Sequence, residues 1–203
     1  GDEIDKAIEA AVDGDTLFLS KGRFNSNFTI NKSISLIGSG AEAGHNEQRS
    51  TSIDWNNSPR IKAGDGKIIS SVTIEGIAFG SSFSVEGKIE NLKVKKCYFS
   101  NGLDIGNGYN NNYNKKVTID RCRLSNISTS GNIEDATIKN CKINNAYGQG
   151  GQTNSSCKFI NCNIRQVDTN TKAMFVNSII NEVGNGTDSY LGNNAILVNT
   201  LYH

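Results

Sequence analysis

An eight-residue pattern recurs seven times between residues 72 and 202, and it constrains the fold more than any other feature of the sequence. One copy reads VTIDRCRL, from Val117 to Leu124. In each copy the first, third and eighth positions are apolar or aromatic, and four copies have cysteine in the sixth. The copies begin at Val72, Leu92, Val117, Ala136, Cys157, Ala173 and Ala195. A repeat of this length indicates that one small structural unit is stacked many times.

The spacing inside the pattern predicts a strand, a sharp bend and a second strand. Positions one and three alternate as in a strand, and the phase then shifts by one residue before positions six and eight, so both strands direct apolar side chains to the same interior. The bend therefore lies at position five. The last four copies place asparagine there, at Asn140, Asn161, Asn177 and Asn199. Asparagine tolerates a left-handed backbone and can bond to its copy one repeat away, which predicts an asparagine ladder.

Stacked units of this kind form a parallel β-solenoid, in which each strand lies about 4.8 Å from its copy in the next coil. We expect a single all-β domain over residues 1–203, with the repeated coils at 72–202. The N-terminal stretch DEIDKAIEAAVDGD has apolar residues at helical spacing, which predicts an amphipathic helix over residues 2–13 that begins at Asp2 and ends before Gly14.

The helix followed by GDTLFLSKGRF and ISLIGSG, the asparagines at the bends and the asparagine-cysteine corners resemble the right-handed parallel β-helices of the pectate-lyase-like superfamily. The resemblance covers nearly the whole chain. It implies a right-handed coil whose N-terminal end is covered by the helix. Residues 41–68 interrupt the pattern and contain the single tryptophan and the single proline, so we expect a long excursion from the coil that carries function.

The cysteines at position six are interpreted as buried, free thiols that pack against one another. Cys97, Cys122, Cys141 and Cys162 would lie one coil apart, where in-register neighbours rarely meet disulfide geometry. Disulfides and a metal site are the alternatives, but the chain has no C-x-x-C pair. We expect a hydroxyl in place of the Cys122 thiol to find poor hydrogen-bond partners.

Charge composition bears on the partners. The chain has 21 basic and 20 acidic residues in interspersed positions, which argues against a nucleic-acid surface and a polybasic membrane patch. No apolar run approaches the roughly 18 residues that a membrane span needs, and the start at Gly1 indicates a processed or trimmed terminus. With the resemblance, these features predict a secreted, periplasmic or cell-surface protein of bacterial origin.

The enzymes of the resembling superfamily suggest where catalysis would lie. Its hydrolases have paired aspartates and a Gly-His-Gly segment, which this chain lacks, since its histidines are His45 and His203. Its lyases hold calcium on aspartates and use Arg or Lys as the base, which makes Lys95, Asp120 and Lys139, outward in position four, the catalytic candidates. The alternative, which we favour, is that these alternating charges pair across neighbouring strands as a surface device. Calcium is expected only under the lyase interpretation, and no other cofactor is expected.

Two loops rich in glycine and asparagine contain the candidate ligand-binding residues. They are NGLDIGNGYNNNYNKK and NNAYGQGGQTNSS, and their candidates are Tyr109, Asn110, Tyr113, Tyr147 and Gln149. Tyrosine rings stack on sugar faces and amides pair with hydroxyl groups. The alternative is a solvated loop whose tyrosines pack on the coil. The predicted function is therefore glycan recognition or scaffolding without catalysis, and the alternative is a polysaccharide lyase or hydrolase acting on uronate-containing polymers.

The outward positions change character in the last coils. Position four, charged in the earlier coils, becomes Ile160, Val176 and Val198. Exposed apolar patches usually mark contact surfaces. This apolar face has three explanations. An excursion or loop folds over it, the molecule associates through it, or the chain is a fragment of a longer coil. Our hypothesis is a homo-oligomer formed through the C-terminal coils.

Overall fold

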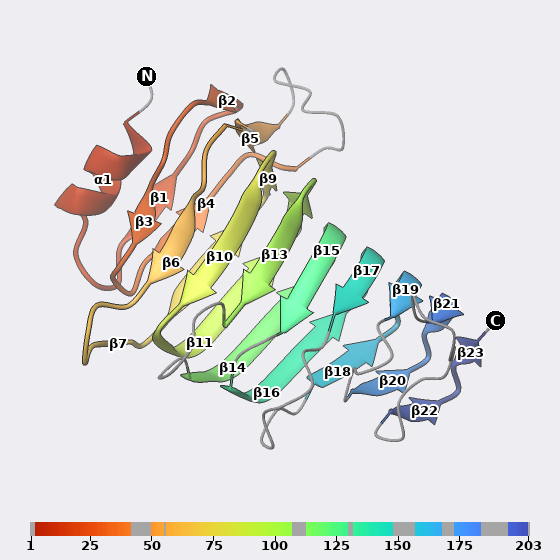
Figure 1. Cartoon of the computed structure of the whole chain (residues 1–203). Coiled ribbons are helices and arrows are strands. Elements are labelled where there is room, and N and C mark those ends of the chain that lie inside the picture. The colour runs from red at the N-terminus through yellow and green to blue at the C-terminus, as the bar shows by residue number, and fades with distance from the viewer. Residues whose placement is uncertain are drawn as a thin grey trace.

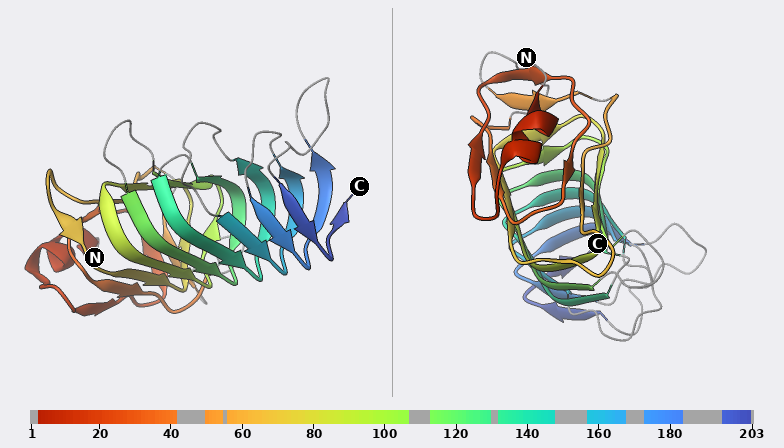
Figure 2. Two further views of the ribbon diagram at one scale, coloured as in Figure 1. Left: turned by 90° about the horizontal axis from the view of Figure 1, so that it is seen from below. Right: turned by 90° about the vertical axis from the view of Figure 1, so that its left-hand side faces the viewer.

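The chain winds into a parallel β-solenoid with one short N-terminal helix (Figure 1). The structure is a computed structural model that describes residues 3–41, 50–54, 56–106, 113–129, 132–147, 157–167, 173–183 and 195–202. Strands of successive coils stack side by side from the helix to the C-terminal end (Figure 2). This architecture confirms the predicted all-β, parallel coil.

Two long sheets form the walls of the coil within the described residues. Sheet A has ten strands: β1 (Thr16–Phe18), β4 (Ser35–Ile37), β7 (Ile68–Ile69), β8 (Val72–Glu75), β11 (Lys88–Lys95), β14 (Tyr113–Asp120), β16 (Asn132–Lys139), β18 (Cys157–Ile160), β20 (Met174–Val176) and β22 (Ile196–Val198). Sheet B has thirteen: β2 (Gly22–Phe24), β3 (Thr29–Ile30), β5 (Thr51–Ile53), β6 (Arg60–Lys62), β9 (Ile77–Phe79), β10 (Ser82–Glu86), β12 (Tyr98–Phe99), β13 (Gly102–Ile105), β15 (Arg123–Thr129), β17 (Lys142–Tyr147), β19 (Asn163–Val167), β21 (Ile179–Val183) and β23 (Leu201–Tyr202).

The strand register confirms the alignment of the repeats. Leu92 pairs with both Val72 and Val117, so the first positions of neighbouring copies form one column. Position five is a left-handed bend in all seven copies. Gly76 has a φ of 69°, and the six other residues have φ between 47° and 56°. These six are Lys96, Arg121, Asn140, Asn161, Asn177 and Asn199. The ladder itself is partial: the Asn161 side chain donates to Asn140 over 3.4 Å.

Apolar columns fill the interior of the coil from end to end. Phe79 and Phe99 stack at a centroid distance of 4.9 Å, and Phe159 and Phe175 stack at 5.0 Å further along. All four rings are almost completely buried. Identical side chains that stack between coils gain both apolar burial and ring contact, which locks the register of the repeats.

The helix α1 (Ile4–Ala10) is shorter than the predicted span of residues 2–13. Ile4 and Ile8 are buried against the first coil, as expected for a capping helix. The helix ends early because Ala11 is extended and Asp15 accepts a hydrogen bond from the Val12 backbone N–H at 2.8 Å. Lys32 then donates from Nζ to the carbonyl of Ala11 at 2.6 Å, which supplies a partner at the end of the helix.

Segment 41–68 differs from the expected excursion where it is described. Its strand β5 pairs with β2 and β9, and its strand β6 pairs with β3 and β10. The described part of this segment therefore belongs to the coil. The sequence pattern did not reveal these strands because they have only three residues each, and one of them reads Arg-Ile-Lys with a single buried side chain.

A second corner, which the sequence analysis did not identify, divides the strands of sheet B. Leu124 and Ile127 are both buried, so the alternation of inward and outward side chains shifts again between them. Asn126 stands at this corner, where Asn145 of the next coil donates to its side-chain oxygen at 2.8 Å. Asparagine thus stacks at two corners of the coil.

Candidate functional site

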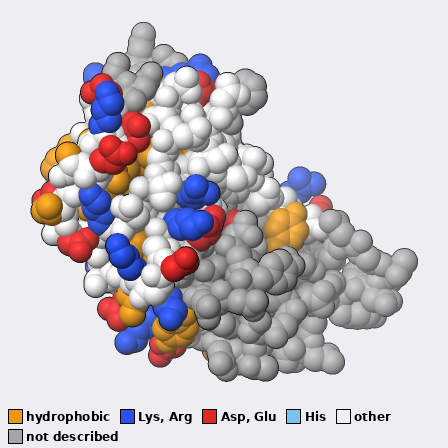
Figure 3. All heavy atoms as spheres, turned by 60° about the vertical axis from the view of Figure 1, so that its left-hand side comes forward, with side chains coloured by type: hydrophobic (Ala, Val, Ile, Leu, Met, Phe, Trp, Pro, Cys, Tyr) orange, Lys and Arg blue, Asp and Glu red, His pale blue; other side chains and the backbone are white. Residues whose placement is uncertain are grey.

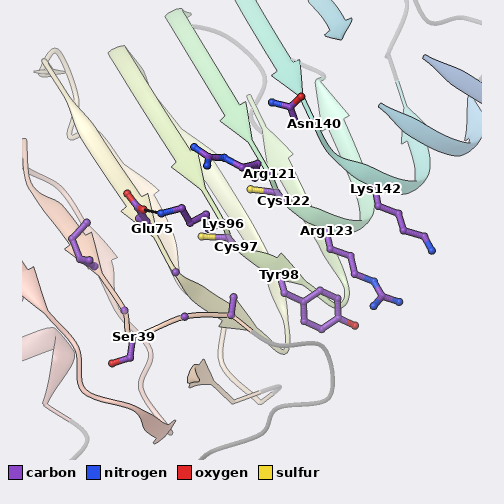
Figure 4. Close-up of a pocket in the computed structure, with 15 residues that line it drawn as sticks. Ser39, Glu75, Lys96, Cys97, Tyr98, Arg121, Cys122, Arg123, Asn140 and Lys142 are labelled. Carbon is purple, nitrogen blue, oxygen red and sulfur yellow. Dashed lines mark hydrogen bonds and ion pairs between the residues drawn. The ribbon is translucent and has the colours of Figure 1, made fainter. Parts of the chain in front are cut away.

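A groove of about 650 Å³ runs along the corner where sheet A bends into sheet B. Its lining residues come from five consecutive coils, which span about 19 Å at the usual strand spacing. Figure 4 shows the side chains that line it. The groove is open, and its long axis crosses the strands, so it suits an extended ligand laid along the solenoid.

Four basic side chains line this corner groove in two columns. Lys96 and Arg121 occupy the bends at position five, and Arg123 and Lys142 occupy position seven. The second column is in register, since Tyr98 pairs with Arg123 and Arg123 pairs with Lys142. In Figure 4, Tyr98, Arg123 and Lys142 project from successive strands in the same direction. A ligand along the groove would meet one of these side chains at each coil.

The groove is positively charged because basic side chains outnumber acidic ones among the residues that line it. Glu75 also lines it, and Lys96 forms an ion pair with this carboxylate at 2.7 Å. Arg121 approaches Asp120 at 3.2 Å. Arg123 and Lys142 have no ion pair within the described residues, whereas Arg123 lies 5.6 Å from the centroid of the Tyr98 ring. This cation–π contact holds the guanidinium and the ring together at the wall of the groove.

The backbone beneath the first cation column is strained. Lys96 has a φ of 49° and Arg121 a φ of 55°, a conformation that glycine and asparagine adopt at lower cost. The neighbouring bends have residues that adopt this conformation more readily, Gly76 and Asn140. A long side chain in this conformation costs on the order of 1 kcal/mol, and such strain is found at functional sites. The two cations therefore stand where the scaffold itself would favour a smaller residue.

Asp120, a catalytic candidate from the sequence, is held as a structural carboxylate. It is 7% exposed, and it accepts a hydrogen bond from Asn140 Nδ2 at 2.9 Å and one from Arg121 Nη2 at 3.2 Å. Burial acts to raise the pKa of Asp120, but these hydrogen bonds and the charge of Arg121 outweigh it and hold the pKa below its usual value. A carboxylate so engaged is a weak proton acceptor.

The other two catalytic candidates, Lys95 and Lys139, lie next to Asp120 in the register of sheet A. The structure thus confirms that position four forms one column. The ion pairs differ from the expectation, because Glu75 and Asp120 pair with the bend residues Lys96 and Arg121, not with lysines of their own column. Lys96 reaches Glu75 of the preceding coil, whereas Arg121 pairs with its own neighbour in sequence, Asp120.

The loop tyrosines that the structure describes lie in different sheets. Tyr113 begins β14 and is 43% exposed, and Tyr147 ends β17 and is 39% exposed. The Tyr113 hydroxyl donates to Glu134, and this hydrogen bond to a carboxylate is the main cause of the raised pKa of Tyr113. The structure does not bring these two tyrosines into the corner groove. The other loop candidates, Tyr109, Asn110 and Gln149, lie outside the described residues.

The position-six column lies directly inside the bends. All five cysteines are free and buried, which confirms the thiol stack. Ile77 holds this position in the first copy, and each of the six later side chains donates to a carbonyl of the preceding coil. Cys122 Sγ, for example, donates to Val94 over 3.7 Å, and Ser178 Oγ donates to Phe159 over 3.3 Å. After Ile77, the column therefore consists of small side chains that donate a hydrogen bond. This shared property explains why four cysteines can be followed by Ser178 and Thr200 in the same column.

The described part of the chain has neither a cluster of metal ligands nor a membrane-spanning helix. No group of three or more His, Cys, Asp or Glu side chains in it is placed to hold a metal ion. Nor does any helix in that part have the length and apolar composition needed to cross a membrane. On the face that includes the N-terminal end, acidic and basic side chains are interspersed (Figure 3).

Comparisons with known proteins leave the site to be interpreted from its own geometry, since no family model, no curated protein and no solved structure matches this chain. The corner groove was not predicted from the sequence. One signal was present, because the bend column has Lys96 and Arg121 where four later copies have asparagine. The tyrosine at position seven, Tyr98, was not distinguishable from a solvated strand residue until the register placed Arg123 beside it.

Proposed function

We propose that this solenoid recognises a polysaccharide in the corner groove, as a non-catalytic binding module. The observation that carries the proposal is the column of Tyr98, Arg123 and Lys142, which presents a ring and two cations on successive coils of one open groove. Tyrosine rings stack on the apolar faces of sugars, and guanidinium and ammonium groups donate to hydroxyl and acidic groups. A polymer of sugars can repeat such contacts from coil to coil.

The proposal extends to the setting of the protein. The parallel coil is compatible with the pectate-lyase-like superfamily, and we propose that the chain is a secreted, periplasmic or cell-surface member of it, of bacterial origin. A solenoid suits this role because its extended surface can follow a long polymer without a deep pocket. The cations of the groove favour glycans with acidic groups over neutral ones.

A glycan array followed by titration calorimetry tests the proposal. The parent protein is expected to bind an acidic polysaccharide, and higher ionic strength is expected to weaken that binding. Arg123→Gln and Lys142→Gln should each weaken it about tenfold, which corresponds to about 1.4 kcal/mol. Lys88→Gln is the matched control, since it removes the same charge from an exposed residue of β11 that does not line the groove. Equal losses in all three variants would indicate nonspecific charge attraction and contradict the proposal.

Two further measurements distinguish the alternatives. Release of unsaturated products from a uronate polymer, with and without added calcium, would favour the lyase interpretation with Lys95 or Lys139 as the base. Loss of binding in Tyr109→Ala and Tyr113→Ala, with full binding in Arg123→Gln, would move the ligand site to the loops. Binding without product release, lost in Arg123→Gln, is the outcome that the corner groove predicts.

A further inference from the structure

A row of cations continues from the corner groove onto one narrow face of the coil. This narrow face lies between the bend at position five and the second corner, where Asn126 and Asn145 stack. Its outward residues, from β12 to β21, are Tyr98, Ser100, Arg123, Ser125, Lys142, Asn144, Asn163, Arg165, Ile179 and Asn181. None of these described residues is acidic. The narrow face is therefore positively charged from β15 to β19, which lie side by side with β17 between them (Figure 1).

Two of the cations stand directly opposite each other. Arg123 pairs in register with Lys142, and both side chains are exposed. Like charges in this position on neighbouring strands destabilise a sheet. In another part of sheet B, by contrast, Lys62 is matched by Glu86 at 3.6 Å. The narrow face lacks such a match among its described residues, so its charges are complementary to an anion from outside the chain.

Arg165 extends the row by one coil. Lys142 pairs in register with Asn163, and Arg165 follows Asn163 by two residues on the same strand, β19. A strand spacing of about 4.8 Å and a rise of about 3.3 Å per residue place the Cα atoms of Lys142 and Arg165 about 8 Å apart. Arg165 is exposed and has no ion pair within the described residues. A ligand that follows the groove to Lys142 meets Arg165 at the next coil.

The row has a limit on each side. Before Tyr98, the same register column has Ala78, which is completely buried. After Asn163, the column has the apolar Ile179, which is 39% exposed. Between these limits, the coils of Tyr98 and Arg165 are three steps apart, which is about 14 Å at the usual strand spacing. The exposed polar row is therefore long enough for several units of a polymer.

We infer that the glycan path runs from the corner groove along the narrow face to Arg165, and that the ligand has anionic groups on successive sugars. The inference rests on the proposed function, because it places more of the same ligand. Arg123, Lys142 and Arg165 donate to carboxylate or sulfate oxygens, and the amide of Asn163 pairs with hydroxyl groups. Closely spaced anionic groups match the row because a cation recurs at each of these coils.

Titration calorimetry with oligosaccharides of two lengths tests the path. The probes are galacturonate and heparin fragments of two and eight sugars, which supply carboxylates alone or sulfates as well. Arg165→Gln should weaken octasaccharide binding about threefold to tenfold and leave disaccharide binding unchanged, since a disaccharide is too short to span the row. Arg165→Lys should retain most of the affinity. Arg60→Gln is the matched control, because Arg60 is an exposed arginine of β6 outside the narrow face.

Asn163 gives a test in both directions. Its side chain is exposed between Lys142 and Ile179 in the register column, and it has no charge of its own. Asn163→Lys should tighten octasaccharide binding about threefold, and Asn163→Asp should weaken it by a similar factor. A general loss of folding cannot produce these opposite signs. The dependence of affinity on salt should become steeper in Asn163→Lys and shallower in Arg165→Gln.

The outcomes separate this inference from the proposed function. Weaker octasaccharide binding in Arg123→Gln, with unchanged binding in Arg165→Gln, would overturn the extended path and leave the groove. A parent that binds none of the probes would overturn both. An effect of Arg165→Gln confined to one set of fragments supports the path and identifies the anionic group as carboxylate or sulfate. Tighter binding of a single-stranded DNA octamer, weakened by the same variants, would overturn the assignment to a glycan.

Discussion

The coils from residue 72 to 143 and those from 157 to 202 have the same interior and different exteriors. Phe79 stacks on Phe99 in the first region as Phe159 stacks on Phe175 in the second. Outward position four is charged in the first region and apolar in the second. The bends also differ, with Gly76, Lys96 and Arg121 before the run of asparagines.

This contrast separates the residues that make the coil from those that give it a surface. Inward columns must match between neighbouring coils, because each side chain packs on its own copy. Outward and bend residues face water, so they can vary from coil to coil. The proposed groove follows this division, because the first region provides its cations, whereas position four of the second region is apolar.

The largest predicted effect is the same in both regions. Phe99→Ala and Phe175→Ala should each lower the free energy of unfolding by about 3–5 kcal/mol, because each removes a completely buried ring from a stack. Urea unfolding monitored by circular dichroism measures this loss. Lys93→Ala, on the outward side of β11, is the control and should change stability by about 0.5 kcal/mol or less. A much smaller loss for Phe175→Ala would show that the two interiors are not equivalent.

The second prediction concerns position six, where thiols predominate in the first region and the second region changes from Cys162 to the hydroxyls of Ser178 and Thr200. Cys122→Val should cost about 1–3 kcal/mol, because a branched side chain overpacks the site and cannot donate. Cys122→Ser should cost about 1 kcal/mol or less, because the hydroxyl finds the carbonyls of Val94 and Asp120 that the thiol already contacts. This corrects the sequence-based expectation of poor partners. Thermal unfolding of both variants decides it, and equal losses would mean that the donor is irrelevant.

Much of the coil could be predicted from the sequence, because the inward columns and the bends are periodic. The seven bends, the register and the buried thiols all follow from one octet. Strand β6 was not predicted because three residues are too few to show an alternation of buried and exposed side chains. The end of α1 was misplaced because Asp15, which follows the helix in sequence, accepts the hydrogen bond of the Val12 N–H. The groove was missed for a different reason. It depends on which outward residues become neighbours across coils, and outward residues obey no period.

The third prediction exchanges the bends of the two regions. Asn177→Lys should lower the free energy of unfolding by about 1 kcal/mol, since lysine adopts the left-handed conformation less readily than asparagine. Lys96→Asn should leave stability unchanged or slightly raised, because relief of this strain offsets the loss of an exposed ion pair with Glu75. The same Lys96→Asn variant should bind the proposed glycan more weakly. A loss of stability in Lys96→Asn would show that the bend lysine serves the fold.

The fourth prediction uses alkali, which acts on the thiols of the interior. Burial raises the pKa of Cys157 to about 12. A thiol with a raised pKa in the folded state contributes stability that is present below about pH 9 and is lost as the pH rises toward 12. Chemical unfolding from pH 8 to pH 11 should show this decline. Cys157→Ala, which restores the alanine found at Ala136 and Ala173 in the same column, should decline less steeply.

The smallest predicted effect lies at acid pH and belongs to the first region. Hydrogen bonds from Asn140 and Arg121 stabilise the ionised form of Asp120, so its pKa is lowered despite its burial. A group with a lowered folded pKa contributes stability that is complete above its unfolded pKa and is lost as the pH falls through the folded value. The loss should therefore appear below about pH 4. Asp120→Asn keeps the size of the side chain and removes the titration, so its stability should depend less on acid pH than that of the parent. If the two acid profiles coincide, Asn140 and Arg121 do not hold Asp120 ionised, and the first region loses its distinct electrostatic character.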